Sequence, residues 1–144
     1  MELLEVYQLA CRLHTGQVDK AGRPYIEHLT RVMLRVQAAG GDLTQQIASL
    51  LHDAIEDGKV SAEQLLWLGV PTDAIELVVT LTKRKGQCYE DYLAGVKRCP
   101  KALVVKLADL DDNSDPIRLS ALPEALAQRL REKYGKARQL LALS

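Results

Sequence analysis

One histidine and three carboxylates fall within six residues of the sequence, at His52, Asp53, Glu56 and Asp57, directly after an apolar run. On a helix, residues four apart lie one above the other, so His52 would align with Glu56 and Asp53 with Asp57. A carboxylate-rich patch at the edge of a core is costly unless a positive charge lies in it. The spacing therefore predicts a bound divalent metal ion and directs the search to further ligands.

Two other parts of the sequence carry candidate ligands. The remaining histidines are His14, on an apolar stripe, and His28, just after a loop rich in glycine and proline. A second acidic patch holds Asp109, and Lys106 and Asn113 would share its helix face at spacings of three and four. Each piece alone also fits a structural interpretation. A histidine beside an apolar stripe is usually a packed core residue, and an acidic run is usually a solvated helix end.

Length and composition favour one helical domain covering residues 1–144. A chain of 144 residues can build a single good core, and its 47% apolar and 26% charged residues are ordinary for a globular protein. Phenylalanine is absent and tryptophan occurs once, so Leu, Val, Ile and Ala must fill the core, which favours helices over a β-sandwich. The 19 basic residues balance 19 acidic ones, which argues against a nucleic-acid-binding protein.

Cysteine usage and the N-terminal residues indicate the compartment. Cys11, Cys88 and Cys99 are odd in number and form no CxxC pair, so neither a zinc knuckle nor a disulfide framework is indicated. Glu2 and Glu5 interrupt the apolar N-terminus, which argues against a signal peptide, and no apolar run approaches the roughly 20 residues that span a bilayer. We therefore expect a cytoplasmic protein with no membrane association.

Hydrophobic periodicity and turn residues predict an all-α bundle of about seven to nine helices. Residues 102–108 would suit a buried strand on propensity alone, but no second convincing strand exists to pair with it, so we expect a helix. The Asp115-Pro116 pair is expected to break the chain. The expected helices cover about residues 2–14, 25 to the glycines at 40–41, 43–55, 61–69, 71–81, 88–98, 102–108 and 121–142.

The order of the chemical groups indicates a family. A histidine, a His-Asp pair followed by Glu-Asp, and a later aspartate on another helix are the signature of the HD metal-dependent phosphohydrolase superfamily. Over about residues 7–118 the sequence resembles the hydrolase domain of the RelA/SpoT family, and its shortness resembles a small, stand-alone alarmone hydrolase. The matching runs are His14-x-Gly16-Gln17, Lys20-x-Gly22-x-Pro24-Tyr25-Ile26-x-His28, Leu51-His52-Asp53-x-x-Glu56-Asp57, Leu81-Thr82-Lys83 and Val105-Lys106-Leu107-Ala108-Asp109-x-x-x-Asn113.

This resemblance implies a metal site made by His28, His52, Asp53 and Asp109. Two imidazoles and two carboxylates leave coordination positions for water and substrate. The mixed nitrogen and oxygen set suits Mn²⁺, which the resemblance also implies, with Zn²⁺ or Fe²⁺ as alternatives. We expect one ion per chain, because only His14 remains for a second metal and it continues an apolar stripe.

The resemblance also implies roles for residues around the metal. Glu56 and Asp57 would orient and deprotonate a water molecule, or alternatively would only hydrogen-bond the ligands. Lys20, Lys106 and Asn113 would contact the substrate, although Lys106 could equally be a structural partner of Asp109.

Two departures from the family pattern bear on the substrate. Asp19 stands where relatives typically carry a basic residue, and Leu110-Asp111-Asp112 stands where relatives often have a basic residue and then Leu-His or Leu-Tyr. Both changes are expected to make the pocket more acidic, and Asp19 in particular replaces a cation that binds phosphate with a repulsive charge.

These observations predict a metal-dependent phosphohydrolase acting on a small nucleotide. The leading expectation is a guanosine-3′,5′-bis(diphosphate) 3′-diphosphatase, which converts (p)ppGpp to GDP or GTP plus pyrophosphate. One alternative is a phosphohydrolase of another nucleotide, such as an adenosine alarmone, NADPH or a nucleoside monophosphate. A second alternative is a non-catalytic nucleotide-binding module on the same scaffold. An oligomer is compatible with each.

Overall fold

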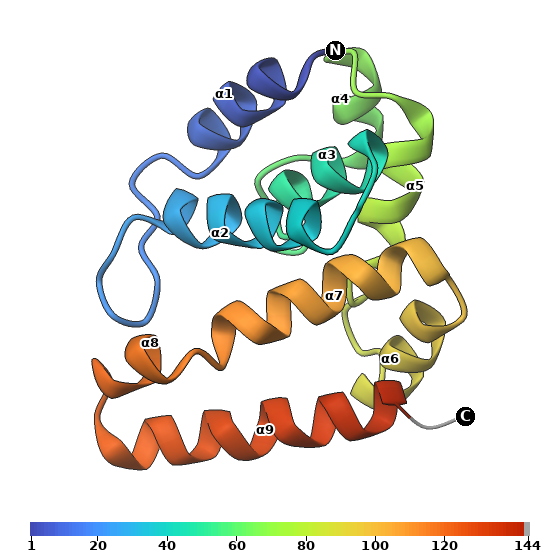
Figure 1. The fold of residues 1–144 in the computed structure, drawn as a ribbon. Coiled ribbons are helices and arrows are strands. Elements are labelled where there is room, and N and C mark those ends of the chain that lie inside the picture. The colour runs from blue at the N-terminus through green and yellow to red at the C-terminus, as the bar shows by residue number, and fades with distance from the viewer. Residues whose placement is uncertain (143–144) are drawn as a thin grey trace.

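The computed structural model describes residues 1–142, and this range contains nine helices (Figure 1). The all-α prediction is confirmed: the β-type pairing within residues 1–142 is a single isolated bridge between Val18 and Pro24. No helix in this range combines the length and apolarity needed to cross a membrane. The helices are α1 (Leu3–Leu13), α2 (Tyr25–Ala38), α3 (Leu43–Leu51), α4 (Ala62–Trp67), α5 (Thr72–Thr80), α6 (Tyr89–Lys97), α7 (Pro100–Asn113), α8 (Pro116–Ser120) and α9 (Glu124–Ala142).

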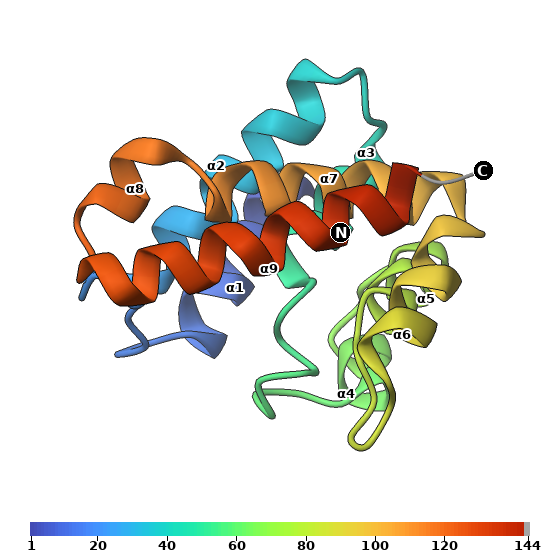
Figure 2. The ribbon, with the colours of Figure 1, turned by 90° about the horizontal axis from the view of Figure 1, so that it is seen from below.

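Helices α2, α3 and α7 pack against one another and form the centre of the bundle. Helices α1 and α5 contact α3 from outside this trio. Helix α9 runs beside α7 and contacts α6, while the short helix α8 connects the two long helices (Figure 1, Figure 2). The trio therefore sets the relative positions of side chains from three distant parts of the sequence.

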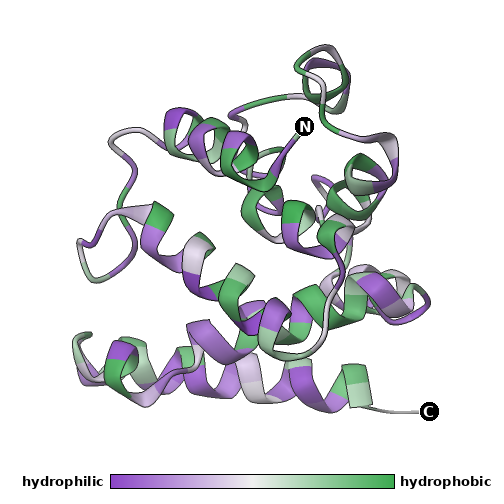
Figure 3. Cartoon of the chain, turned by 45° about the horizontal axis from the view of Figure 1, so that its top comes forward, coloured by the Kyte–Doolittle hydropathy of each residue, from purple (hydrophilic) through white to green (hydrophobic). Residues whose placement is uncertain are grey.

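Aliphatic side chains fill the core, as the composition predicts. Leu29, Val32, Leu50, Leu51 and Val105 are all fully buried in one hydrophobic cluster. Figure 3 shows hydrophobic and hydrophilic residues alternating around the helices, so each helix buries one stripe and exposes another.

Side-chain caps define the starts of α3 and α4, among other helices. The Asp42 carboxylate accepts a hydrogen bond from the Gln45 backbone amide and starts α3. The Ser61 hydroxyl accepts one from the Gln64 amide and starts α4, and the Gln64 side chain accepts one in return from the Ser61 amide. Each cap satisfies an amide that has no partner within its own helix.

Helix α3 ends at Leu51, and the prediction that it continues to Ile55 is wrong. The His52 ring donates through Nδ1 to the Ser49 carbonyl oxygen at 2.6 Å. A continuing helix would use that oxygen for the Asp53 amide, so the ring competes with the next helical hydrogen bond. Residues 52–58 instead form consecutive turns that end at Gly58, whose φ is 72°. Residues 52–57 therefore do not lie on one helix face.

The second difference concerns Asp115-Pro116, which begins helix α8 where the sequence predicted only a break. The Asp115 carboxylate accepts hydrogen bonds from the Ile117 amide at 2.8 Å and the Arg118 amide at 3.3 Å. Pro116 occupies the first helical position, where its missing N–H costs nothing. This short helix places Arg118 against the carboxylates of Asp112 and Asp19.

Replacing glycine with alanine should have opposite effects on stability at Gly41 and at Gly135. A Cβ on Gly41 would lie 2.4 Å from Val36 Cγ1, so Gly41→Ala should lower the free energy of unfolding by about 1–3 kcal/mol. A Cβ on Gly135, inside α9, meets nothing within 4 Å, so Gly135→Ala should raise it by up to about 1 kcal/mol. Urea unfolding followed by circular dichroism measures both changes. A Gly41→Ala protein as stable as the parent would contradict the close approach at Val36.

Candidate metal centre

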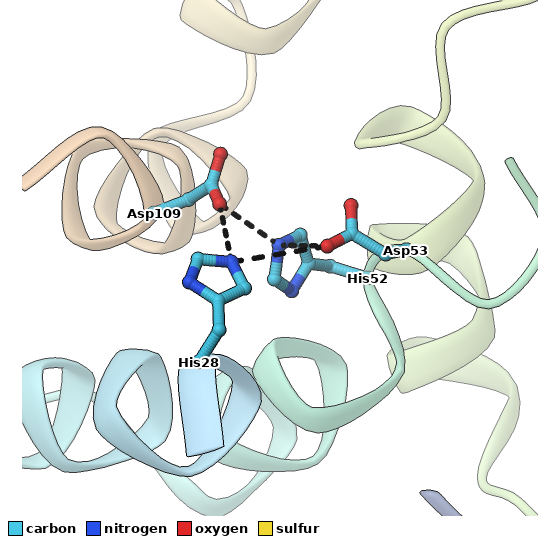
Figure 4. A group of neighbouring side chains, drawn as sticks. All are labelled: His28, His52, Asp53 and Asp109. Carbon is cyan, nitrogen blue, oxygen red and sulfur yellow. Dashed lines mark hydrogen bonds and ion pairs between the residues drawn. The ribbon is translucent and has the colours of Figure 1, made fainter. Parts of the chain in front are cut away.

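Four side chains from three parts of the fold point toward one centre (Figure 4). His28 comes from the first turn of α2, His52 and Asp53 from the end of α3, and Asp109 from α7. One nitrogen or oxygen atom of each lies within 4.8 Å of those of the other three. Asp109 Oδ1 is 3.0 Å from His28 Nε2 and 3.2 Å from His52 Nε2. The fold thus brings together all four residues that the sequence nominated as ligands.

Both imidazole rings are held from behind by a hydrogen-bond acceptor. His28 Nδ1 donates to Asp112 Oδ2 at 2.7 Å, and His52 Nδ1 donates to the Ser49 carbonyl at 2.6 Å. An Nδ1 proton fixed on the outer side makes Nε2 of each ring the inward-facing nitrogen, which becomes available as a metal ligand once it gives up its own proton. Two nitrogens and two carboxylates then meet as electron donors, an arrangement that needs a positive charge at its centre.

The electrostatics of the site agree with that requirement. Burial lowers the pKa of His52, but the charges of Asp53 and Asp109 outweigh it and raise that pKa well above its usual value. Burial raises the pKa of Asp109, but the Lys106 charge and hydrogen bonds from both histidines bring it well below its usual value. The two carboxylates therefore create a negative field. The nitrogen and oxygen donor set fits a divalent metal ion.

Tyr25 fixes the remaining ligand. Its hydroxyl donates a hydrogen bond to Asp53 Oδ2. Burial and the nearby Asp53 charge raise the pKa of Tyr25, so the hydroxyl keeps its proton and remains a donor. Its ring also lies 5.5 Å from that of His28, which packs the two side chains against each other.

The sequence did not identify Asp112, which supports His28 from behind. Its side chain is buried and also accepts hydrogen bonds from Arg31 at 2.8 Å and Arg118 at 2.7 Å. Burial raises the pKa of Asp112, but hydrogen bonds from His28 and Arg31 bring it below its usual value. Its spacing of three from Asp109 was the available signal, since such residues share a helix face.

The acidic departures do not add free negative charge to the pocket, which corrects that expectation. Asp112 is neutralised by two arginines, and Asp111 forms an ion pair with Arg138 at 2.6 Å. Asp19 accepts backbone hydrogen bonds from its own loop and lies 3.0 Å from Arg118. Burial raises the pKa of Asp19, but these hydrogen bonds bring it below its usual value.

Lys106 and Asn113 both contact Asp109. Lys106 Nζ lies 3.1 Å from Asp109 Oδ2, and Asn113 Nδ2 donates to Asp109 Oδ1 at 3.2 Å. Both residues also line a cavity of about 500 Å³ that reaches His52, Asp53 and Asp109. Lys20 is exposed and lines a second cavity of about 230 Å³, which shares Tyr25, Asn113 and Tyr134 with the first.

Glu56 and Asp57 occupy the turns after α3 and differ in exposure to the cavity. Glu56 lines the larger cavity, and its Oε1 accepts a hydrogen bond from the Lys83 backbone amide at 2.7 Å. Asp57 is exposed, and its Oδ2 accepts a hydrogen bond from Gln17 Nε2 at 3.0 Å. Each carboxylate is thus held by a loop that is distant in sequence.

Lys133 is a further cavity residue that sequence reasoning missed. It lies on α9 and lines the larger cavity with Lys83 and Lys106. Its Nζ lies 5.7 Å from the centre of the Tyr89 ring. Burial, and next the charges of Lys20 and Lys106, lower the pKa of Lys133. Nothing in the mixed charges of α9 marks this lysine in the sequence.

Comparison with known proteins gives one family and a consistent set of relatives. The family described as HD domain matches residues 7–87. A probable GTP pyrophosphokinase of Mycobacterium leprae is 30% identical over 134 residues, covering 88% of this chain and 17% of the relative. The bifunctional (p)ppGpp synthase/hydrolase RelA of Mycobacterium tuberculosis is 30% identical over 138 residues, covering 90% of this chain and 19% of the relative.

Two further similar proteins are named for hydrolysis. The guanosine-3′,5′-bis(diphosphate) 3′-pyrophosphohydrolase of Aquifex aeolicus is 30% identical over 120 residues, covering 78% of this chain and 17% of that protein. The chain spans less than a fifth of the length of these curated relatives. The solved structure of a metazoan ortholog of SpoT that hydrolyzes ppGpp superposes with a TM-score of 0.78 at 26% identity, covering 96% of this chain and 82% of that one.

The adjacent aspartates Asp111 and Asp112 predict different effects on metal binding. Asp112→Ala removes the acceptor behind His28, so the ring is no longer held with Nε2 inward, and Mn²⁺ affinity should fall by about 10- to 100-fold. Asp111→Ala removes only a surface ion pair with Arg138, so affinity should not change. Isothermal titration calorimetry measures both affinities, and thermal melting verifies that each variant is folded.

A third variant separates support of the ring from loss of folding. Asp112→Asn keeps an oxygen that can accept from His28 and should bind Mn²⁺ more tightly than Asp112→Ala. Equal affinity in the parent protein and a folded Asp112→Ala variant would contradict the role of Asp112.

Proposed function

Since the chain belongs to the HD domain family, we propose that it is a metal-dependent phosphohydrolase that removes the 3′-pyrophosphate of guanosine tetra- or pentaphosphate. Water is the second reactant, and the products are GDP or GTP plus pyrophosphate. The observation that carries the proposal is the convergence of two inward Nε2 atoms and two carboxylates, with each ring held from behind. The substrate is supported by the named activities of the RelA and Aquifex relatives and of the metazoan ortholog.

We propose that His28, His52, Asp53 and Asp109 hold one Mn²⁺ ion. Imidazole and carboxylate together suit a borderline-hard divalent ion, and Zn²⁺ and Fe²⁺ are the competing ions. His14 bonds to Gln17 through Nδ1 and is not among the four residues whose nitrogen and oxygen atoms converge, which supports a single ion. A divalent ion there would polarise a phosphoryl oxygen and lower the pKa of a bound water molecule.

The chain's own carboxylates would handle the proton of the attacking water. Glu56 lines the same cavity as the ligands, and the Lys83 amide fixes one of its oxygens, which leaves the other to accept a proton. Asp57 would orient the same water from the neighbouring turn. In this assignment Tyr25 does not exchange its proton, because it remains a donor to Asp53.

Lysines would bind the phosphates of the substrate. Lys83, Lys106 and Lys133 line the larger cavity, and Lys106 also offsets the Asp109 charge. Lys20 and Asn113 line the smaller cavity, so a nucleotide reaching from one cavity to the other would contact all five residues. Ammonium groups of this kind bind phosphate as point charges.

We further propose that residues 1–144 form one domain in the cytoplasm. Helix α9 lies beyond the region matched by the family, yet it packs against α6 and α7 and supplies Lys133 to the cavity. Residues 143–144 lie outside the described residues. Cys11, Cys88 and Cys99 are free, which fits a reducing compartment.

A nucleotide panel in Mn²⁺ tests the proposed reaction. The wild-type protein should release pyrophosphate from ppGpp, and Asp53→Ala should lower kcat by roughly three orders of magnitude because it removes a metal ligand. Release that survives Asp53→Ala would contradict the metal mechanism. Turnover of an adenosine alarmone, NADPH or a nucleoside monophosphate, but not of ppGpp, would overturn only the substrate. Failure to bind Mn²⁺, Zn²⁺ or Fe²⁺ and to hydrolyse any nucleotide would favour a non-catalytic binding module.

Two lysines of helix α9 predict different effects on substrate binding. Lys133→Gln removes a cation that lines the cavity, so KM for ppGpp should rise by about three- to tenfold, with the larger rise at low salt. Lys136→Gln removes an exposed charge 3.8 Å from Glu90 and should leave KM unchanged. Steady-state kinetics at two ionic strengths distinguish them, and an equal rise in both variants would indicate only a general charge effect.

A further inference from the structure

Asp57 occupies a position that its own backbone does not fix. It lies in the turns after α3, its side chain is exposed, and the local backbone bond joins its amide to the Asp53 carbonyl. An exposed aspartate on a turn samples several rotamers unless another group selects one. The group that does so must come from elsewhere in the chain.

Gln17 supplies that contact from the loop between α1 and α2. Its Nε2 donates to Asp57 Oδ2 at 3.0 Å across 40 positions of sequence. Its Oε1 lies 2.7 Å from His14 Nδ1. Because the amide nitrogen must face the carboxylate, Oε1 must face the imidazole, and His14 must carry its proton on Nδ1. The hydrogen bonds therefore run in one direction, from His14 to Gln17 to Asp57.

His14 is the buried anchor of this relay. Its side chain is only 4% exposed, and its ring lies 5.2 Å from that of Tyr25, whose hydroxyl donates to Asp53. His14 Nε2 is buried and has no hydrogen-bond partner among residues 1–142. Burying the two polar nitrogens of an imidazole is costly when neither has a hydrogen-bond partner, so a ring needed only for packing would be unfavourable here. The hydrogen bond to Gln17 offsets part of that cost and gives the histidine a role beyond packing.

We propose that His14 and Gln17 are positioning residues that hold the Asp57 carboxylate toward the attacking water. This inference rests on the role proposed for Asp57. His14 acts through Gln17. It is not one of the four residues that form the candidate metal centre, and it does not line the larger cavity. The His14 ring also packs against Tyr25, whose hydroxyl donates to Asp53, so one buried side chain aligns both a metal ligand and the carboxylate that orients the water.

Turnover by ring and amide variants tests the relay. His14→Phe keeps a ring against Tyr25 and removes the donor, and Gln17→Ala removes the link itself. Each should lower kcat for ppGpp by about ten- to a hundredfold, since a carboxylate misplaced by about 1 Å costs that much, with KM unchanged. His14→Asn places an amide nitrogen where Nδ1 lies and should recover part of the loss. Thr15→Ala, in the same loop, should retain the wild-type rate.

Combined variants decide whether the effect passes through Asp57. In an Asp57→Ala background, Gln17→Ala should lower the residual rate no further, and His14→Phe with Gln17→Ala should equal Gln17→Ala alone. Additive losses in either case would overturn the relay. A loss of rate in His14→Phe that His14→Asn does not reduce would also overturn it, because packing alone would then explain the effect.

Proton NMR of the metal-free protein provides a readout that needs no activity. The Nδ1 proton of His14, identified by its absence in His14→Phe, should give a slowly exchanging downfield signal that disappears in Gln17→Ala. A signal that persists in Gln17→Ala would overturn the relay even if the enzyme is active. An absence of turnover by the wild-type protein would overturn the proposed function, and the NMR signal would still decide whether the hydrogen bond exists.

Discussion

The orientation of two imidazole rings is the constraint on which the rest of the site depends. His28 and His52 each have an acceptor behind Nδ1, a carboxylate in one case and a main-chain carbonyl in the other. Without those acceptors the rings could turn, and the inward Nε2 atoms would no longer meet Asp53 and Asp109. The supports come from α7 and from within α3, so the packing of α2, α3 and α7 determines the geometry of the centre. The ability of this site to hold a metal ion therefore depends on how these three helices pack.

The negative charges at this centre are surrounded by positive side chains. The inner carboxylates are negative, and Lys106 on one side and the arginines contacting Asp112 on the other compensate them. Arg118 forms ion pairs with both Asp112 and Asp19. An acidic residue in the loop before α2 is therefore balanced by a basic residue from α8. The net charge of the pocket cannot be obtained by counting residues in the motif segments alone.

The sequence was informative where chemistry and periodicity coincide. The four ligand-type residues and most helices follow from residue order and from apolar spacing, and the structure places them as expected. The end of α3 could not be predicted, because it depends on a ring-to-carbonyl hydrogen bond that hydrophobic spacing does not encode. Asp112, Arg118 and Lys133 were missed for a related reason: their partners lie far away in sequence, and only the packing of α7, α8 and α9 brings them together.

The hydrogen bond from His52 to the Ser49 carbonyl gives one side chain two duties, since the ring that faces the metal centre also stops the helix. A chain in which residue 52 cannot make that bond is free to wind onward, and each added helical residue would turn by about 100° and advance about 1.5 Å. Asp53, Glu56 and Asp57 would then be carried to new directions. Transplanting this centre into another helical scaffold therefore requires copying a helix terminus, because an uninterrupted helix bearing the same residues would present a different surface.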